Sequence, residues 1–181
     1  IDLDEFEDWP EAVRETAIAL AEELFLVRYN PFIDAETVRQ SVQTRFDQTV
    51  PGLAHHYATT LREGLTMFWS SYDSDMEFRD ELIRRIGQVV PRDRIDLRPG
   101  SLVECSTDAT DLRMELPLLV VAPASAEEVS AVVRLANEMK FALIPRGGAS
   151  GCTGGAIPAR KRTVVMTLQK LSRIRDVNTG E

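Results

Sequence analysis

The chain has 181 residues, of which 44% are hydrophobic and 28% charged, and its formal net charge is −8. This composition suits a globular protein with one sizeable core or two modest ones, while the net acidity argues against a nucleic-acid-binding protein and no apolar run is long enough to cross a bilayer. The two cysteines, Cys105 and Cys152, lie far apart and lack metal-ligand spacing, so we expect a reducing, cytoplasmic location.

Four helices are expected in the first half of the chain, each marked by a signal at its start. Asp8 is the expected N-cap of the first helix and Asp34 that of the second. The third helix is expected to begin at "TVPG", residues 49–52. The fourth is expected to begin at "SDME", in which Ser74 and Glu77 form a capping box. Together these signals predict an all-α region.

Apolar residues recur every three or four positions over residues 8–90, which predicts a separate helical bundle. Leu20, Leu61 and Leu82 are expected to share its core. The two adjacent histidines at positions 55 and 56 would point about 100° apart on a helix, and they are expected to be solvated or to face a partner. No catalytic residue is expected in this half, and a docking or scaffolding role fits it.

The stretch "VPRDRIDLRPGS", residues 90–101, is rich in proline and arginine and shows no apolar period. We interpret it as a linker between the two halves. The expected domain organisation is therefore a helical N-terminal domain, residues 1–98, followed by a second and incomplete domain, residues 99–181.

The second half alternates buried strands with a helix. Leu116–Pro123 is predicted to be a strand, and the capping box formed by Ser125 and Glu128 is expected to start a helix. A second strand is expected at residues 141–145 and a third at Thr163–Leu168. A strand, a crossover helix and a second strand predict a right-handed parallel unit. The expected fold class is thus α+β: an all-α region followed by a small α/β unit with a short parallel sheet.

A glycine-rich loop, "IPRGGASGCTGGAIP" (Ile144–Pro158), lies between the second and third of these strands. It follows the second strand and opens no helix, so it matches neither the Rossmann fingerprint nor a Walker A loop. We interpret it as a backbone nest, in which successive N–H groups turn toward an anion and Ser150 and Thr153 add hydroxyl donors. The alternative is a flexible glycine linker.

Basic residues concentrate around this loop. The window Met139–Arg175 contains eight basic residues and no acidic one, whereas residues 1–100 hold 20 acidic and 11 basic residues. A site for an anionic ligand would explain this window. A basic surface that faces an acidic segment elsewhere would explain it equally well, so both interpretations stay open.

The stretch "TDATDLRMELPLLVVAPASAEEVSAVVRLANEMKFALIPRGGASGCTGGAIP" resembles the start of the PCMH-type FAD-binding domain of the vanillyl-alcohol-oxidase flavoprotein superfamily. Within that superfamily it is most similar to the D-lactate dehydrogenase and glycolate oxidase group. The shared features are, in order, a Thr-Asp pair, a strand that ends in proline, the "SAEEV" helix start and the Pro-Arg-Gly-Gly loop. The resemblance covers the chain from about Cys105 to its end, so it implies a truncated first subdomain.

The resemblance implies that backbone amides of the loop bind the FAD diphosphate and that Pro123 lies near the adenine end. Carried over by position, the cofactor-binding residues of the loop are Arg146, Gly147, Gly148, Ala149, Ser150, Gly151 and Gly154. The family often has glycine at the position of Ala149, where an alanine is expected to fit only at a negative φ. Some members link flavin through a loop histidine, where this chain has Ser150. Cys152 stands at a position that is often apolar and is expected to pack.

The resemblance implies an FAD-linked oxidoreductase that oxidises a small 2-hydroxy acid of the D-lactate or glycolate type by hydride transfer to flavin. An electron-acceptor protein or iron–sulfur domain is the partner that such chemistry implies. The family's catalytic groups lie in later segments, so residues 1–181 are expected to hold neither a catalytic residue nor a metal site and to be inactive alone. The alternatives are another flavoenzyme of the superfamily or a non-catalytic interaction module led by the helical half. The ending "IRDVNTGE" is expected to be a strand that runs into a turn, and the chain to be an excerpt of a longer protein.

Overall fold

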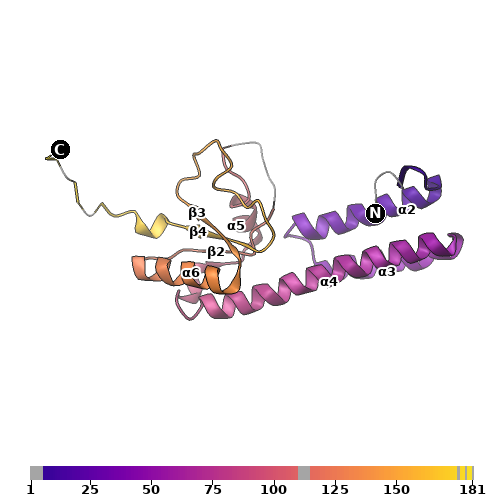
Figure 1. The fold of residues 1–181 in the computed structure, drawn as a ribbon, viewed down its shortest axis with the longest axis horizontal. Coiled ribbons are helices and arrows are strands. Elements are labelled where there is room, and N and C mark those ends of the chain that lie inside the picture. Colours follow the sequence, from indigo (N-terminus) through magenta and orange to yellow (C-terminus); the bar gives the residue numbers. More distant parts are fainter. Residues whose placement is uncertain (1–5, 110–114, 175, 178, 181) are drawn as a thin grey trace. The chain divides into compact units, whose positions relative to one another are not determined.

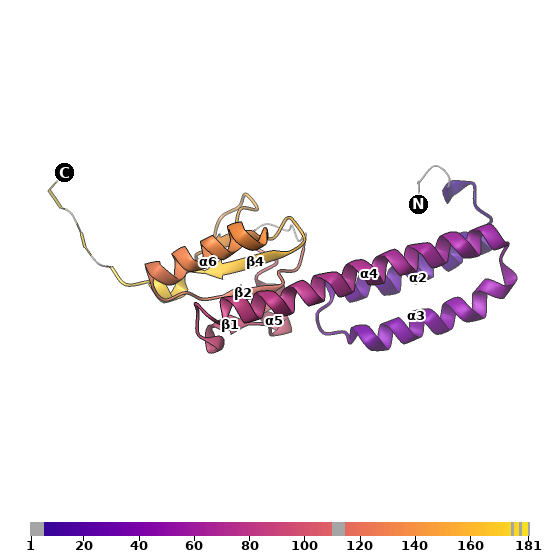
Figure 2. The same cartoon turned by 60° about the horizontal axis from the view of Figure 1, so that its bottom comes forward.

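The computed structural model describes residues 6–109, 115–174, 176–177 and 179–180, and Figures 1 and 2 show it as a ribbon. It divides into two compact units, Ile1–Met76 and Glu77–Glu181. The first is helical and the second combines helices with a four-stranded sheet, so the expected α+β class is confirmed. No helix among the described residues is both long enough and apolar enough to cross a membrane.

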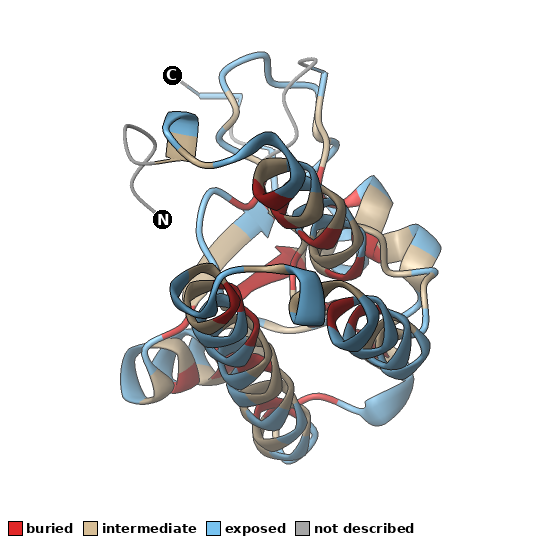
Figure 3. Ribbon diagram, turned by 90° about the vertical axis from the view of Figure 1, so that its right-hand side faces the viewer, coloured by how far each residue is buried: buried red, intermediate tan, exposed pale blue. Residues whose placement is uncertain are grey.

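The first unit is built from α2 (Glu11–Tyr29), α3 (Ala35–Thr49), the short helix η1 (Val50–Gly52) and the first part of α4 (His55–Ile86). Each helix turns its apolar stripe inward, so buried residues lie on the inner sides of the helices and exposed ones on the outer sides (Figure 3). The core formed in this way consists of Ala17, Leu20, Val42, Phe46, Leu61 and Leu65.

Only some of the predicted helix starts are confirmed. Asp34 caps α3, and its carboxylate accepts a hydrogen bond from the amide of Thr37 at 3.0 Å. The residue before α2 is Pro10 and not Asp8, and residues 50–52 form η1 instead of opening the next helix. The expected start at Ser74 is wrong, because α4 continues through it to Ile86. No proline interrupts this stretch, and Ser-x-x-Glu is also compatible with a helix interior.

The two compact units divide within α4, between Met76 and Glu77, and not at the expected domain boundary after residue 98. The last part of α4 therefore belongs to the second unit. Leu82 is fully buried there against strands of the sheet, whereas Leu20 and Leu61 lie in the helical core. The expectation that these three leucines share one core is wrong, and an independent domain of residues 1–98 stays a prediction.

The sheet of the second unit has the strand order β1-β2-β4-β3. Its strands are β1 (Ile95–Asp96), β2 (Leu119–Val121), β3 (Ala142–Arg146) and β4 (Thr163–Thr167). The three expected strands are thus present and run parallel, with β4 inserted between β2 and β3. The short β1 pairs antiparallel with β2.

The expected linker at residues 90–101 is instead part of this fold. It contains η2 (Arg92–Arg94), β1 and the first residues of α5 (Pro99–Glu104). Ile95 in β1 is only 8% exposed, so its burial anchors the segment to the sheet. At the other end of the chain, the described residues after η3 (Gln169–Leu171) form no strand, and Arg175, Asn178 and Glu181 of the expected hairpin lie outside the described residues.

Helices cover both faces of the sheet (Figure 2). On one face α6 (Ala126–Met139) and the end of α4 pack on residues of β2 and β4, including Val164 and Met166. On the other face Leu102 and Cys105, from α5 and its C-cap, pack on Val120 and Val165. Ser125 caps α6 as expected, since its hydroxyl accepts a hydrogen bond from the amide of Glu128. Both faces of the sheet are therefore covered by helices.

Candidate functional site

The glycine loop leaves the carboxyl end of β3, directly after Arg146. The register pairs Arg146 with Thr167 at the end of β4, and Val121 at the end of β2 with Met166. The carboxyl ends of all three parallel strands therefore meet at one edge of the sheet, and the loop lies at that edge. Ligands of open α/β sheets bind outside the carboxyl ends of the strands.

Three glycines of this loop are not required by the packing of the chain itself. A Cβ atom built on Gly147, Gly148 or Gly151 would have no protein atom within 4 Å, and none of these three residues has a positive φ. Side chains could therefore be present there without a clash or backbone strain. What the glycines provide is open space beside the backbone, which allows a ligand to approach the main chain closely.

The main chain of the loop offers unused hydrogen-bond donors. Within the described part of the chain, the amides from Gly148 to Gly155 donate no hydrogen bond. Ser150 and Thr153 lie in the same exposed stretch and carry hydroxyl groups. Amides without a partner among the described residues can bind an anion such as a diphosphate.

Ala149 adopts a left-handed backbone, with φ of +53°. The expectation that an alanine fits this position only at a negative φ is therefore wrong. Gly154 is the glycine of the loop with a positive φ, at +72°. A left-handed residue between residues of other conformations turns successive amides toward the same side, which is the geometry of an anion-binding nest.

The side chain of Arg146 is turned into the protein and is 9% exposed. Its guanidinium donates to the carbonyl oxygens of Thr107 at 2.8 Å, Ala156 at 3.2 Å and Glu104 at 3.2 Å. The side chain thus joins the two ends of the glycine loop to the C-terminal end of α5. Arg146 holds the loop in place from inside, and its backbone, not its guanidinium, is what it can offer to a ligand.

Pro123 follows β2 at the same edge of the sheet, and its side chain is fully buried. Next to it, the amide of Ala124 donates to the carboxylate of Glu128, which also binds the guanidinium of Arg94 through two hydrogen bonds of 2.6 and 2.7 Å. Glu127 adds a second acidic residue to the first turn of α6. This helix start is therefore capped and negative, so a diphosphate is better placed at the glycine loop.

Several basic residues of the window Met139–Arg175 lie at the amino ends of the parallel strands, on the side of the sheet opposite to the glycine loop. Lys140 ends α6, and residues 160–162 directly precede β4, where the amide of Ala142 donates to the carbonyl of Arg162. These four side chains stand at the amino ends of β3 and β4, away from the loop. The basic residues of this window are therefore divided between the amino ends and the carboxyl ends of the strands. The nest depends on amides more than on basic side chains.

The two cysteines have opposite environments. Cys152 is exposed, with its sulfur 4.0 Å from the carbonyl oxygen of Ser150, so the expectation that it packs is wrong. Cys105 is buried beneath α5, and this burial raises the pKa of its thiol, which keeps it protonated at neutral pH.

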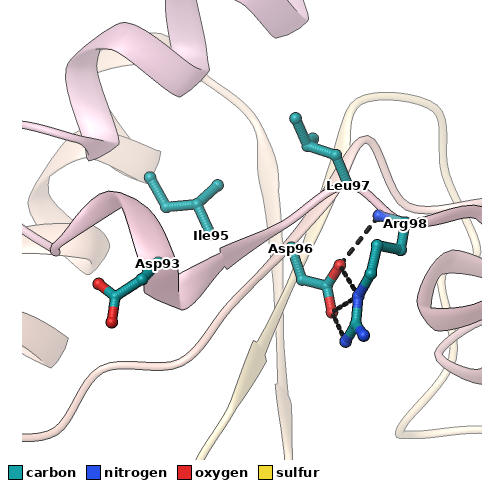
Figure 4. A pocket seen from close by; sticks show the side chains of 5 residues that line it. All are labelled: Asp93, Ile95, Asp96, Leu97 and Arg98. Carbon is teal, nitrogen blue, oxygen red and sulfur yellow. Dashed lines mark hydrogen bonds and ion pairs between the residues drawn. The ribbon is translucent and has the colours of Figure 1, made fainter.

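An open hollow of about 610 Å³ lies along the outer strand β1, lined by Asp93, Ile95, Asp96, Leu97 and Arg98 (Figure 4). The carboxylate of Asp96 accepts hydrogen bonds from Arg98 and from the hydroxyl of Ser101. These contacts hold the pKa of Asp96 far below its usual range. β1 and β3 are the two outer strands of the sheet, so β2 and β4 separate the hollow beside β1 from the glycine loop that follows β3.

The second half of the chain is similar to known proteins. Residues 117–181 match the family described as "FAD binding domain". A D-2-hydroxyglutarate dehydrogenase of Xanthomonas citri pv. viticola is 37% identical over 99 residues, which are 55% of this chain and 21% of that protein. The glycolate oxidase subunit GlcD of Escherichia coli (strain K12) is 26% identical over 100 residues, 55% of this chain and 20% of that protein. The chain thus spans about a fifth of the length of these relatives.

Solved structures show the same fold. A substrate-bound p-cresol methylhydroxylase matches 56% of this chain and 20% of that one, with a TM-score of 0.50 and 19% identity. An alkyldihydroxyacetonephosphate synthase matches 55% of this chain and 22% of that one, with a TM-score of 0.50 and 23% identity. Residues 117–181 match the FAD binding domain family and about half of the chain shares the fold of these structures, so the expected fold class and FAD as the cofactor are confirmed.

Proposed function

We propose that this chain supplies the diphosphate-binding segment of an FAD-dependent oxidoreductase that acts on a small 2-hydroxy acid. The relatives support the substrate class, since they are named D-2-hydroxyglutarate dehydrogenase, D-lactate dehydrogenase and glycolate oxidase subunit. When bound, FAD supplies the flavin that accepts a hydride from the carbon bearing the hydroxyl group. The groups that bind and deprotonate the hydroxy acid are proposed to lie outside residues 1–181.

The observation that carries this proposal is the open space at Gly147, Gly148 and Gly151. A Cβ there would meet no atom of the protein, so the chain's own fold does not explain the absence of side chains. Gly52, Gly64 and Gly100 are equally open, so what distinguishes the loop is that its open glycines lie among amides that donate no hydrogen bond to described residues. The unpaired amides of the same stretch match the oxygens of a diphosphate in their hydrogen-bonding character.

Each predicted cofactor-binding residue receives a distinct role in this proposal. The amides from Gly148 to Gly154 donate to the diphosphate, and the hydroxyl of Ser150 adds a side-chain donor. Ala149 sets the curvature of the loop through its left-handed backbone. Arg146 holds the two ends of the loop together. Pro123 shapes the neighbouring strand end, on the side proposed for the adenine.

The wider context of this activity is also a proposal. A flavin that has accepted a hydride must be reoxidised, so the enzyme needs an electron acceptor, for which a partner protein or an iron–sulfur domain is suitable. A cytoplasmic location would match the two cysteines, neither of which the structure places in a disulfide.

The experiment that tests this proposal compares two substitutions in the full-length protein. Gly148→Val should abolish flavin retention, because a branched side chain fills the space that the diphosphate needs. Ser150→Ala should cost about one hydrogen bond, roughly 0.5–1.5 kcal/mol, or at most about a tenfold loss of affinity. Flavin content is measured from the absorption spectrum after gel filtration.

The same substitutions in the 181-residue chain provide the control. Gly148→Val should leave its thermal unfolding nearly unchanged, because a Cβ atom at this position meets no protein atom within 4 Å. This separates loss of the ligand from loss of the fold. Retention of flavin by Gly148→Val, together with its loss in Ser150→Ala, would show that side chains and not amides form the site.

A further inference from the structure

The outer side of α2 carries large apolar residues that the structure leaves exposed. Ile18 is 48% exposed and Phe25 is 61% exposed. The helix already buries its opposite side, through Val13, Ala17, Leu20 and Val27. At 100° per residue, Ile18 and Phe25 point about 20° apart. They therefore form one apolar patch that turns away from the core of the helical unit.

Acidic residues interleave with this patch. Glu11, Glu15 and Glu22 project from the same sector of α2, which spans about 80° together with Ile18 and Phe25. All three glutamates are exposed, and none forms an ion pair with another described residue. We call the surface made by these five residues the α2 face.

The aromatic end of the α2 face is held in place. The ring of Phe25 contacts that of Tyr29, with 4.6 Å between their centroids. Leu26 and Phe32 extend the apolar area near the end of the helix, at 46% and 69% exposed. Exposed aromatic residues gathered in this way mark an interaction surface more often than a plain solvated one.

The charge of this unit indicates what kind of partner fits. Residues 1–76 hold 15 acidic and 5 basic residues, a net charge of −10. An anionic membrane or a nucleic acid would be repelled by such a surface. A helix with one apolar side flanked by lysine or arginine would bury the patch and pair with the glutamates.

We propose that the α2 face is a docking surface for a basic amphipathic helix of a partner protein. The apolar side of that helix covers Ile18 and Phe25, and its basic flanks reach Glu11, Glu15 and Glu22. This inference does not depend on flavin binding, since every residue that carries it lies in the helical unit.

A synthetic peptide tests this proposal on the 181-residue chain. The probe is an amphipathic helix with leucines on one side and lysines on the other, and its counterpart carries glutamates in place of the lysines. Fluorescence anisotropy of the labelled peptides measures binding. The basic peptide should bind and the acidic one should not, and added salt should weaken the binding without abolishing it.

The substitution Phe25→Asp distinguishes docking from general attraction to an acidic protein. It removes the apolar anchor and adds a negative charge, so docking predicts binding weaker by about tenfold or more, a typical loss for an aromatic anchor. General electrostatic attraction predicts unchanged or tighter binding. Met67→Asp is the matched control, because it places the same charge at another exposed apolar residue, 73% exposed and on α4. It should leave binding unchanged.

Two results would overturn the proposal. The first is equal binding of the basic peptide by the original chain and by Phe25→Asp. The second is a concentration-dependent dimer in analytical ultracentrifugation that Phe25→Asp dissociates, because a second copy would then occupy the face.

Charge reversal by Glu15→Lys with Glu22→Lys should weaken binding of the basic peptide and permit binding of the acidic one.

Discussion

Two residues of the glycine loop have a left-handed backbone, and they differ in what that conformation costs. Gly154 carries no Cβ atom, so its φ of +72° is free of strain. Ala149, with φ of +53°, places its Cβ close to the following carbonyl, at a cost of roughly 1–2 kcal/mol. Such a cost is characteristic of functional loops, in which the surrounding structure imposes the conformation.

Ala149→Gly should therefore remove strain from the loop. The unfolded chain gains entropy when alanine is replaced by glycine, which costs about 0.4–1 kcal/mol of stability, so the net stabilisation is at most about 1.6 kcal/mol. Gly154→Ala should do the opposite and destabilise by roughly 1–2 kcal/mol. Urea unfolding of the two variants measures both effects. An unchanged free energy of unfolding in Gly154→Ala would contradict the left-handed conformation at that position.

Arg146 is the residue whose role the sequence pattern least revealed. Its position next to the glycines suggests a contact with the cofactor. Its guanidinium instead donates to carbonyl oxygens that lie 10, 39 and 42 positions away along the chain. Local sequence carries no information about such distant acceptors. The place of the loop itself was predictable, because glycines between two buried strands are visible in the sequence.

Arg146→Met should strongly destabilise the 181-residue chain. Methionine keeps an apolar stem of similar length but leaves the carbonyls of Glu104, Thr107 and Ala156 without their donor, on the order of 3 kcal/mol in total. Arg146→Lys should be intermediate, because an ammonium group cannot reproduce the fork of a guanidinium. Chemical denaturation ranks the stabilities of the two variants and the original chain. If Arg146→Met unfolded at the same denaturant concentration as the original chain, the role of Arg146 in holding the loop would be disproved.

At the scale of elements, the sequence predicted the larger pieces and missed the short ones. The strands β2, β3 and β4 and the helices α2, α3 and α6 were foreseen, because each has a sustained apolar pattern. The strand β1 and the first residues of α5 lie in the segment predicted to be a linker, since both elements are too short to show an apolar period. The sequence predicts two helices where the structure has α4, because Ser74 and Glu77 have the spacing of a capping box.

The ion pair between Arg94 and Glu128 connects two of these elements. Arg94 lies at the end of η2, just before β1, while Glu128 lies in the first turn of α6. The Arg94 guanidinium, and after it the amide of Ala124, lower the pKa of Glu128 below its ordinary value of 4.5. A carboxylate with a lowered folded-state pKa adds stability above its unfolded pKa and loses it as the pH falls through the folded value.

Glu128→Gln should therefore lower the stability of the chain at pH 7 by about 1 kcal/mol, the scale of a partly exposed charged contact. Below about pH 4.5 the difference between variant and original should shrink, because the original protonates too. Thermal melts at pH 7 and at pH 3 measure this. Glu15→Gln, at an exposed glutamate of α2, is the control and should change neither melt.

At the scale of the whole molecule, the proposed cofactor site is only partly supplied by this chain. The relatives are about five times longer than the 99 or 100 residues that align with this chain, so most contacts to the adenine, ribityl and flavin groups are proposed to come from segments outside it. What this chain offers is one loop of amides at one edge of a four-stranded sheet. Such a loop can select a diphosphate without holding a whole dinucleotide.

The 181-residue chain alone should accordingly bind FAD weakly. Association costs roughly 4–15 kcal/mol in lost translational and rotational freedom, whether a ligand makes all its contacts or only some. A segment that supplies only the diphosphate contacts offsets that cost by a small margin at most, so FAD should separate from the chain during gel filtration. Equilibrium titration, followed by flavin fluorescence, should give a dissociation constant in the range of about 1 mM or weaker, which corresponds to about −4 kcal/mol or less favourable. Gly148→Val should remove even this weak binding while leaving the fold intact. Flavin that stays on the purified chain would show that residues 1–181 already contain a complete site.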